Sequence, residues 1–260
     1  MSERREAGIP PSRERGPSGP APKAPRAGEM SEQELTEEDV ARMATPLWER
    51  ARAAFRQGRP EEGDRLLDAA VAQWQALQDY SINWVASLLT FVGEELGEPA
   101  VERALRKTGD EYVRPRRDGT DWNALPASTR ARAIARAMVA NMSSVDVSED
   151  DDKIVLAFRC GTGGRLIDEG RYEGDAAYLT LHEREGRTFM RDALPVYCAH
   201  CAVNNEIQPV EWTGVPTTIE HPPEHPGEPC IHHVYKDAAA VPTEVYERLG
   251  KRAPTEDPPT

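Results

Sequence analysis

All four cysteines and all six histidines of this chain lie between Cys160 and His233, in less than a third of its length. Thiolates and imidazoles are the ligands that Zn²⁺, Fe–S clusters and Cu(I) prefer. The fold must therefore accommodate a segment rich in metal-ligating side chains, and the sequence predicts metal binding, thiol chemistry or both within it. The segment contains Cys160-Gly161-Thr162-Gly163-Gly164-Arg165, then Cys198-Ala199-His200-Cys201, then Cys230-Ile231-His232-His233.

The cysteines are spaced as metal ligands. Cys198 and Cys201 are separated by two residues, which lets both thiolates reach one ion or makes one the attacker and the other the resolving thiol. Cys160 and Cys230 each lie beside a predicted strand end, so they can complete a four-cysteine set. The alternative is that the four thiols are small buried hydrophobic side chains, because free cysteine is often buried.

Three histidines are candidates to replace a cysteine in the ligand set or to act in catalysis. They are His200, His232 and His233. Alternate residues of a strand share a face, so Cys230 and His232 point the same way and His233 points to the other face. We therefore expect His200 and His232, rather than His233, at the site.

The glycines that follow Cys160 allow a tight turn, which would bring this cysteine towards the others. A phosphate-binding loop is a weaker interpretation, because the Gly-Lys-[Ser/Thr] ending of such loops is missing. Arg165 is predicted to orient an anionic substrate, since a guanidinium binds a carboxylate with two hydrogen bonds. Candidates for a general base to a metal-bound water are Asp168, Glu169, Glu206 and Glu211.

The hydrophobic periodicity predicts an α+β fold. Residues 1–32 and 251–260 are predicted to be disordered, 33–126 to be helical, and 127–250 to form an α+β domain rich in Cys and His. In the helical region the pattern predicts one helix from Thr36 to about Phe55, a second around Leu66–Leu77 and a third over Ser81–Leu96. Further predicted elements are a helix from Ser128 to about Met142, a strand pair at 145–148 and 154–158, a helix start at Pro195, and strands at 217–220 and 231–235.

Charge and hydropathy exclude two classes of partner. The net charge of −13 disfavours nucleic-acid phosphates, which need a basic surface. No apolar run approaches the ~18–20 residues that span a bilayer, so no membrane contact is expected. The N-terminus lacks a signal-peptide core, which predicts a cytoplasmic protein in which cysteines serve metals or redox chemistry rather than disulfides. Association into a homo-oligomer stays open.

The part of the chain after Ser128 resembles two groups of proteins, the 4-vinyl-reductase-type (V4R) ligand-binding domains and the L-2-amino-thiazoline-4-carboxylic acid hydrolase-like proteins. The matching features are the strand pair ending at Cys160, the sequence Tyr197-Cys198-x-x-Cys201, and the closing Gly227-Glu228-Pro229-Cys230-Ile231-His232. The resemblance implies a small-molecule pocket beside a cysteine-rich metal or thiol site. The Gly-Thr-Gly-Gly-Arg segment and the helical first half do not belong to that pattern.

These observations predict a metal-dependent enzyme, hydrolase-like, in which zinc lies beside a pocket for a small anionic molecule. One alternative is a non-enzymatic sensor or binding domain with a structural four-cysteine zinc site. Another is an Fe–S or thiol-redox protein that uses Cys198 and Cys201 directly.

Overall fold

The computed structural model describes residues 35–117 and 119–254, and they fall into two compact units that divide between Leu67 and Asp68. This division differs from the boundary predicted between residues 126 and 127, because helices before that point share a core with elements after it. The segment 1–32, predicted to be disordered, lies outside the described residues, as do residues 255–260 of the predicted tail 251–260. Lys251, which was predicted to belong to the C-terminal tail, instead forms an ion pair with Glu211 at 2.6 Å.

The first unit contains two short helices and the start of a long one. They are α1 (Glu37–Ala44), α2 (Leu47–Arg56) and the first residues of α3 (Pro60–Leu96). Thr36 caps α1, because its hydroxyl accepts the Asp39 N–H while the Asp39 carboxylate accepts the Thr36 N–H, each at 3.1 Å. The single helix predicted from Thr36 to Phe55 is wrong, since the chain leaves the helix at Thr45 and Pro46 before α2 begins.

Helix α3 is a continuous helix of 37 residues. The prediction of two separate helices here is also wrong. Between Leu77 and Ser81 the chain has no glycine or proline to end a helix, and the polar residues there interrupt the apolar pattern without breaking the helix. The predicted break at Gly58 and Pro60 is confirmed, with Gly58 at a φ of +68°.

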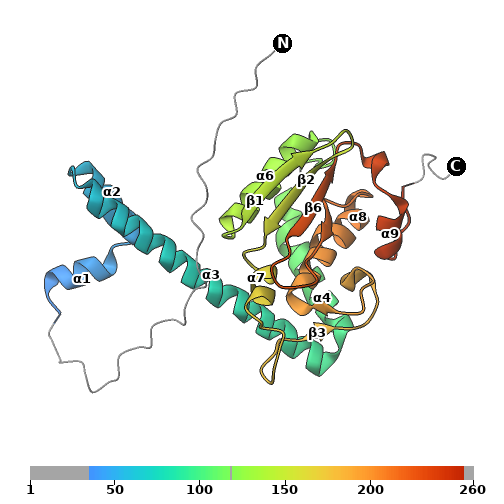
Figure 1. The fold of residues 1–260 in the computed structure, drawn as a ribbon, viewed down its shortest axis with the longest axis horizontal. Coiled ribbons are helices and arrows are strands. Elements are labelled where there is room, and N and C mark those ends of the chain that lie inside the picture. Colours follow the sequence, from blue (N-terminus) through green and yellow to red (C-terminus); the bar gives the residue numbers. More distant parts are fainter. Residues whose placement is uncertain (1–34, 118, 255–260) are drawn as a thin grey trace, which may run out of the picture. The chain divides into compact units, whose positions relative to one another are not determined.

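The second unit is α+β, as predicted. Its four-stranded antiparallel sheet has the order β1-β2-β6-β5, and a short β3–β4 ladder is separate (Figure 1). Beyond α3 the elements are α4 (Glu98–Thr108), η1 (Gly109–Val113), α5 (Arg114–Arg117), α6 (Ala127–Ala140), β1 (Ser144–Glu149), β2 (Lys153–Arg159), α7 (Gly163–Asp168), β3 (Thr180–Leu181), η2 (Gly186–Thr188), β4 (Leu194–Pro195), η3 (Val196–Cys198), η4 (Cys201–Ile207), α8 (Gln208–Thr213), β5 (Ile219–His221), β6 (Cys230–Tyr235), η5 (Ala238–Ala240) and α9 (Thr243–Arg248).

One face of the sheet packs against α6. Alternate residues of β2 (Ile154, Leu156 and Phe158) and of β6 are buried there, together with Ala131 and Ile134 of α6. A second, larger core joins α3, α4, η4, α8 and α9. The segments η1 and η4 are π-helical, a local widening that often occurs at functional sites.

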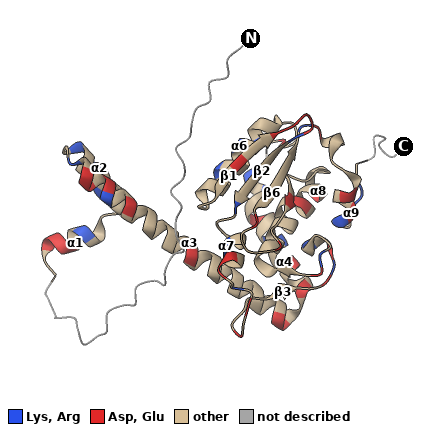
Figure 2. Ribbon diagram, in the orientation of Figure 1, with Lys and Arg blue, Asp and Glu red and all other residues tan. Residues whose placement is uncertain are grey.

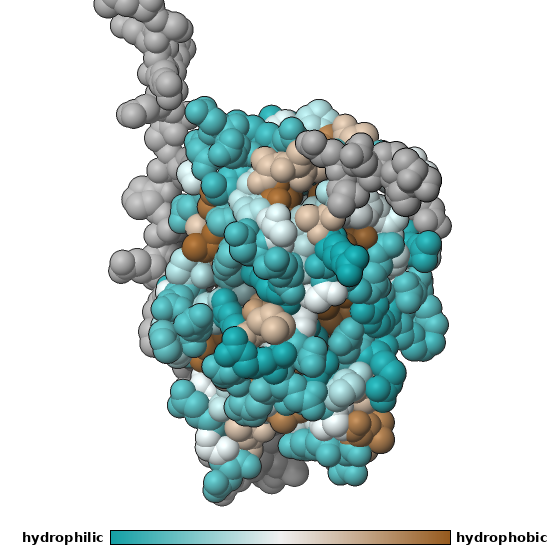
Figure 3. Space-filling model, turned by 90° about the vertical axis from the view of Figure 1, so that its right-hand side faces the viewer, coloured by the Kyte–Doolittle hydropathy of each residue, from teal (hydrophilic) through white to brown (hydrophobic). Residues whose placement is uncertain are grey.

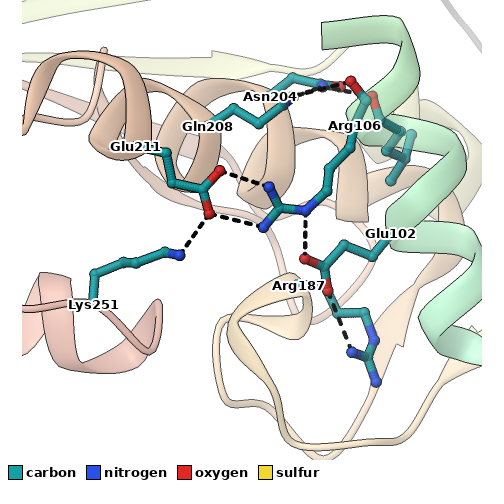
Figure 4. Close-up of polar contacts among 8 residues, drawn as sticks. Glu102, Arg106, Arg187, Asn204, Gln208, Glu211 and Lys251 are labelled. Carbon is teal, nitrogen blue, oxygen red and sulfur yellow. Dashed lines mark hydrogen bonds and ion pairs between the residues drawn. The ribbon is translucent and has the colours of Figure 1, made fainter. Parts of the chain in front are cut away.

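A polar network joins α4 to α8 and to the residues after α9 (Figure 4). Arg106 donates to Glu211 through its two terminal nitrogens, Nη1 at 2.6 Å and Nη2 at 3.0 Å. Its Nε donates to Glu102 at 2.8 Å. One turn before Glu211 in α8, the Gln208 amide donates to the Arg106 carbonyl at 3.0 Å. Gly109 leaves room for this amide because it has no Cβ atom to overlap it. None of the helices in the described residues combines the length and the apolar character that a bilayer-spanning segment needs.

Candidate metal centre

Four separate elements of the second unit bring the cysteines into one region. Phe158 pairs with Cys230 in the β2–β6 register, so Cys160, two residues past Phe158, follows β2 beside the start of β6. Cys198 ends η3 and Cys201 begins η4. Burial, together with the proximity of the other cysteines, raises the pKa of Cys198, Cys201 and Cys230.

The glycine segment lets Cys160 and Cys198 approach each other. A Cβ atom on Gly163 would lie 3.0 Å from the Cys198 sulfur, and one on Gly164 would lie 2.8 Å from Cys160 Cβ. The Cys160 sulfur is 3.3 Å from the Thr162 hydroxyl. Glycine is therefore required here for packing against the cysteines. The predicted turn is limited to Gly161 and Thr162, because Gly163 and Gly164 begin helix α7.

A buried His–Glu pair lies next to the cysteines. The β5–β6 register places Glu220 opposite His232, and His232 Nε2 lies 3.4 Å from Glu220 Oε1. Glu220 is 0 % exposed and His232 is 3 % exposed. Within the described part of the chain, neither ring nitrogen of His232 nor Glu220 Oε2 has a hydrogen-bond partner. Leaving a buried polar atom unpaired costs about 1–3 kcal/mol, so this arrangement favours an additional ligand.

Two residues of η4, Asn205 and Glu206, hold Glu220 in place. Asn205 donates to its Oε1 at 2.9 Å, and its backbone N–H donates to Glu206 at 2.6 Å. Glu206 in turn accepts from Arg248 with both carboxylate oxygens at 2.6 Å. Burial and the neighbouring Glu206 raise the pKa of Glu220 to about 8, and burial raises the pKa of Glu206 to about 7 against the opposing charge of Arg248.

His200 has the tautomer of a metal ligand. Its Nδ1 is 2.6 Å from the Tyr197 carbonyl, and this nitrogen must donate because a carbonyl oxygen only accepts. Nε2 then carries the lone pair, and it accepts a hydrogen bond from the Cys201 thiol at 3.5 Å. Burial lowers the pKa of His200 and lowers that of His232 to about 3, so both imidazoles are neutral at pH 7.

The surroundings of Cys198, Cys201 and Cys230 favour the thiol over the thiolate. Burial is the main cause that raises the pKa of Cys198, Cys201 and Cys230 above the ordinary thiol value, and neighbouring acidic groups add to it. In the residues that the structure describes, no three Cys, His, Asp or Glu side chains are arranged as a ligand set for a metal ion. Binding an ion would require the side chains to rotate and the thiols to lose protons.

Other predicted site residues have different surroundings. Arg165 is paired with Asp79 at 2.5 Å and with Glu169 at 2.9 Å, and its role towards an anionic substrate stays a prediction. Of the four candidate bases, only Glu206 lies beside the cluster. Glu169 pairs with Arg165, Asp168 with Arg159, and Glu211 with Arg106.

Glu220 was not predicted to be a site residue, although its strand was predicted. Its only signal was a carboxylate that ends the short stretch Thr217-Thr218-Ile219, where an acid is unusual for a buried strand. Arg248 and Asn205, which hold the carboxylates, gave no signal because they come from other elements.

The chain matches no protein-family model, no curated protein and no solved structure. The resemblance to the V4R-type and hydrolase-like groups therefore stays a prediction. What can be argued about function depends on the geometry of the site itself.

Proposed function

We propose that this protein binds a zinc ion at the cluster formed by the four cysteines with Glu220 and His232. The observation that carries the proposal is the buried pair of Glu220 and His232, whose free acceptor atoms have no partner in the described residues. A cation there would satisfy the carboxylate and an imidazole nitrogen together, and the neighbouring Cys201 and Cys230 supply thiolates. Zinc accepts sulfur, nitrogen and oxygen ligands in one tetrahedral site.

The surroundings favour zinc over the two redox alternatives. A reactive Cys-x-x-Cys needs a thiol whose pKa is lowered, whereas burial raises the pKa of Cys198 and Cys201. Fe–S clusters are usually held by four thiolates, a ligand set that leaves Glu220 and His232 unexplained. The burial of the cluster favours an ion that stabilises the fold.

Hydrolysis of a small anionic molecule is a second candidate function. Room for a small molecule exists in a cavity of about 280 Å³ that is lined by uncharged residues, among them Thr162, Tyr197 and residues of α3. The anionic character of the substrate rests on the prediction for Arg165. Thr162 contacts the Cys160 sulfur, so this cavity adjoins the cysteine cluster. A catalytic zinc site keeps one coordination position open for water, and the cavity is where such a position would be reached.

The test is elemental analysis and thiol titration of the full chain after anaerobic purification. We expect one zinc and no iron per chain, and fewer reactive thiols before chelation than after it. His232→Ala should lose the zinc, whereas His225→Ala, a histidine exposed in the loop before β6, should retain it. Four freely titrating thiols and no metal in the wild type would overturn the proposal, and iron with visible absorption would replace it with the Fe–S alternative.

The same variants separate the structural role from the catalytic one. If Cys230→Ser and Cys201→Ser lower the melting temperature sharply, the ion stabilises the fold. If they leave the melting temperature unchanged but abolish zinc-dependent ester or amide hydrolysis, the ion is catalytic.

A further inference from the structure

Helix α3 carries a long apolar stripe that faces away from the α+β core. Its members recur in steps of three and four residues, and they are Trp74, Leu77, Ser81, Trp84, Leu88 and Phe91. The aromatic and leucine side chains are half or more exposed, from 50 % for Trp74 to 64 % for Leu77. On the opposite side of the same helix, Gln78, Ile82, Ala86 and Leu89 are buried.

The stripe is free of charge. Between Ala69 and Gly93 the only Asp, Glu, Lys or Arg is Asp79, and most of this stretch of α3 is tan in Figure 2. Asp79 pairs with Arg165 of α7. By contrast, the face of the molecule drawn in Figure 3 is mainly hydrophilic, with apolar side chains in small separate groups. In a chain of net charge −13, this uncharged helix face is where two copies can meet without repulsion.

The spacing selects a helical partner. Alternating steps of three and four residues give the seven-residue repeat of a coiled-coil seam, in which each apolar side chain fits between four others. The residues flanking the seam, Val71, Gln73, Tyr80, Val85 and Ser87, are uncharged too. Because the flanks of the seam are neutral, they cannot select a partner of opposite charge. A second copy of the same helix has equally neutral flanks and is therefore compatible with this seam.

We propose that the α3 stripe is the interface of a homodimer, in which two copies of α3 pack antiparallel. The stripe is nearly symmetric about residue 79: an antiparallel partner places Trp74 against Trp84, Leu77 against Ser81, and Ala70 against Leu88. Small residues then oppose large ones in two of the three layers, and the tryptophans stack in the third. A parallel pair would instead place Trp74 against Trp74 and Ser81 against Ser81.

The exposed area is sufficient for a stable pair. An aromatic side chain contributes about 150–250 Å², and Trp74, Tyr80, Trp84 and Phe91 each expose half or more of theirs. Together with Val71, Leu77, Val85 and Leu88, the stripe approaches the ~800 Å² per partner of a standard interface. The cavity beside Tyr197 opens along this stripe, with Trp74, Leu77 and Val85 in its wall, so the second copy would form part of its boundary.

Sedimentation velocity of the full chain over a concentration series tests the proposal. We expect a species of twice the chain mass of 28.8 kDa. Trp84→Glu places one negative charge in each of the two copies at the interface. It should therefore weaken association at least ~30-fold. Val147→Glu introduces the same charge at an apolar residue of β1 that is 63 % exposed, and it should leave the dimer intact. Circular dichroism checks that both variants stay folded.

Cysteine cross-linking tests the orientation. Tyr80 of the two copies would be adjacent across the symmetry axis of an antiparallel pair, whereas Trp74 would meet Trp74 only in a parallel pair. Tyr80→Cys should therefore form a covalent dimer under oxidation, and Trp74→Cys should not, with the wild type giving the background from the native thiols. The opposite result overturns the antiparallel arrangement. A wild type that stays monomeric at every concentration, or a monomer that binds neutral lipid vesicles through α3, overturns the dimer.

Discussion

Two polar regions flank the same helical segment, η4 with α8, and they differ in how completely their groups are paired. On the side of α4, Arg106 and Glu211 satisfy each other, with Glu102, Gln208 and Lys251 completing the network (Figure 4). On the side of the sheet, His232 and Glu220 are more deeply buried and retain unpaired atoms. In the first region the side chains of Arg106, Glu211, Glu102, Gln208 and Lys251 are all paired, although Nε of the adjoining Arg187 has no partner among the described residues. The unpaired atoms of the second region lie on both partners of its central pair and are the reason for proposing an ion there.

If the proposed ion is bound, removing it should give the largest of the expected effects. A structural zinc contributes its binding free energy to folding. A strong chelator should therefore lower the melting temperature of the wild type by ~10 °C or more, since 1 kcal/mol corresponds to about 2–4 °C in a chain of this size. His232→Ala should melt early and show no further response to the chelator. A wild type that melts at the same temperature with and without chelator would contradict the structural role.

Arg248→Met should have the second largest effect on stability, because it removes the cation that neutralises Glu206. This carboxylate is 0 % exposed, and losing one partner of a buried ion pair costs about 3–5 kcal/mol. Urea unfolding measures the loss. Adding Glu206→Gln should recover part of it, because an amide oxygen still accepts the Glu220 N–H without burying a charge. Equal stability of the single and double variants would mean that Arg248 acts through packing alone.

Gly109→Ala should have an intermediate effect on the paired region. The added methyl group would overlap the Gln208 amide, and the resulting shift should cost about 1–3 kcal/mol. Combining it with Gln208→Ala removes the overlapping group. In a double-mutant cycle the two changes should therefore be less than additive. Simple additivity would show that the overlap is relieved elsewhere.

Glu211→Gln should have the smallest effect, about 1 kcal/mol or less, because the pair with Arg106 is partly exposed. Burial acts to raise the pKa of Glu211, but hydrogen bonds from Arg106 and Lys251 outweigh it and lower the pKa. The carboxylate therefore stabilises the fold above its unfolded pKa, and this contribution is lost as pH falls through the folded pKa. The stability difference between wild type and variant should accordingly shrink on acidification. A difference that does not change with pH would show that the charge is irrelevant.

Much of the fold follows from local sequence. The capping residue Thr36, the break at Gly58, the hairpin at β1 and β2, and the alternation that buries Cys230 and His232 were all predicted from periodicity and turn chemistry. The continuity of α3 was missed because its middle changes from one apolar face to two, one for the core and one for the exposed stripe. Sequence patterns identify the apolar faces of a helix well, but they do not show which of these faces packs against the rest of the protein.

The site was predicted in part. Residue type and spacing pointed to the cysteines and to His232, whereas Glu220 depends on the pairing of β5 with β6, a contact between distant parts of the chain. Glu206 was one of four carboxylates that spacing could not rank. The structure separates them, because it gives three of them surface ion pairs and places Glu206 against Glu220. Composition and motifs do not predict which residues of distant strands pair with each other, and the site depends on that pairing.

The measurement that tests the central claim most directly is X-ray absorption at the zinc edge of the purified full chain. The proposed ligand set predicts sulfur neighbours at ~2.3 Å together with nitrogen or oxygen neighbours at ~2.0 Å, and Cys201→Ser should reduce the sulfur contribution. A spectrum without sulfur neighbours, or a folded chain that carries no zinc, would contradict a metal centre at this cluster.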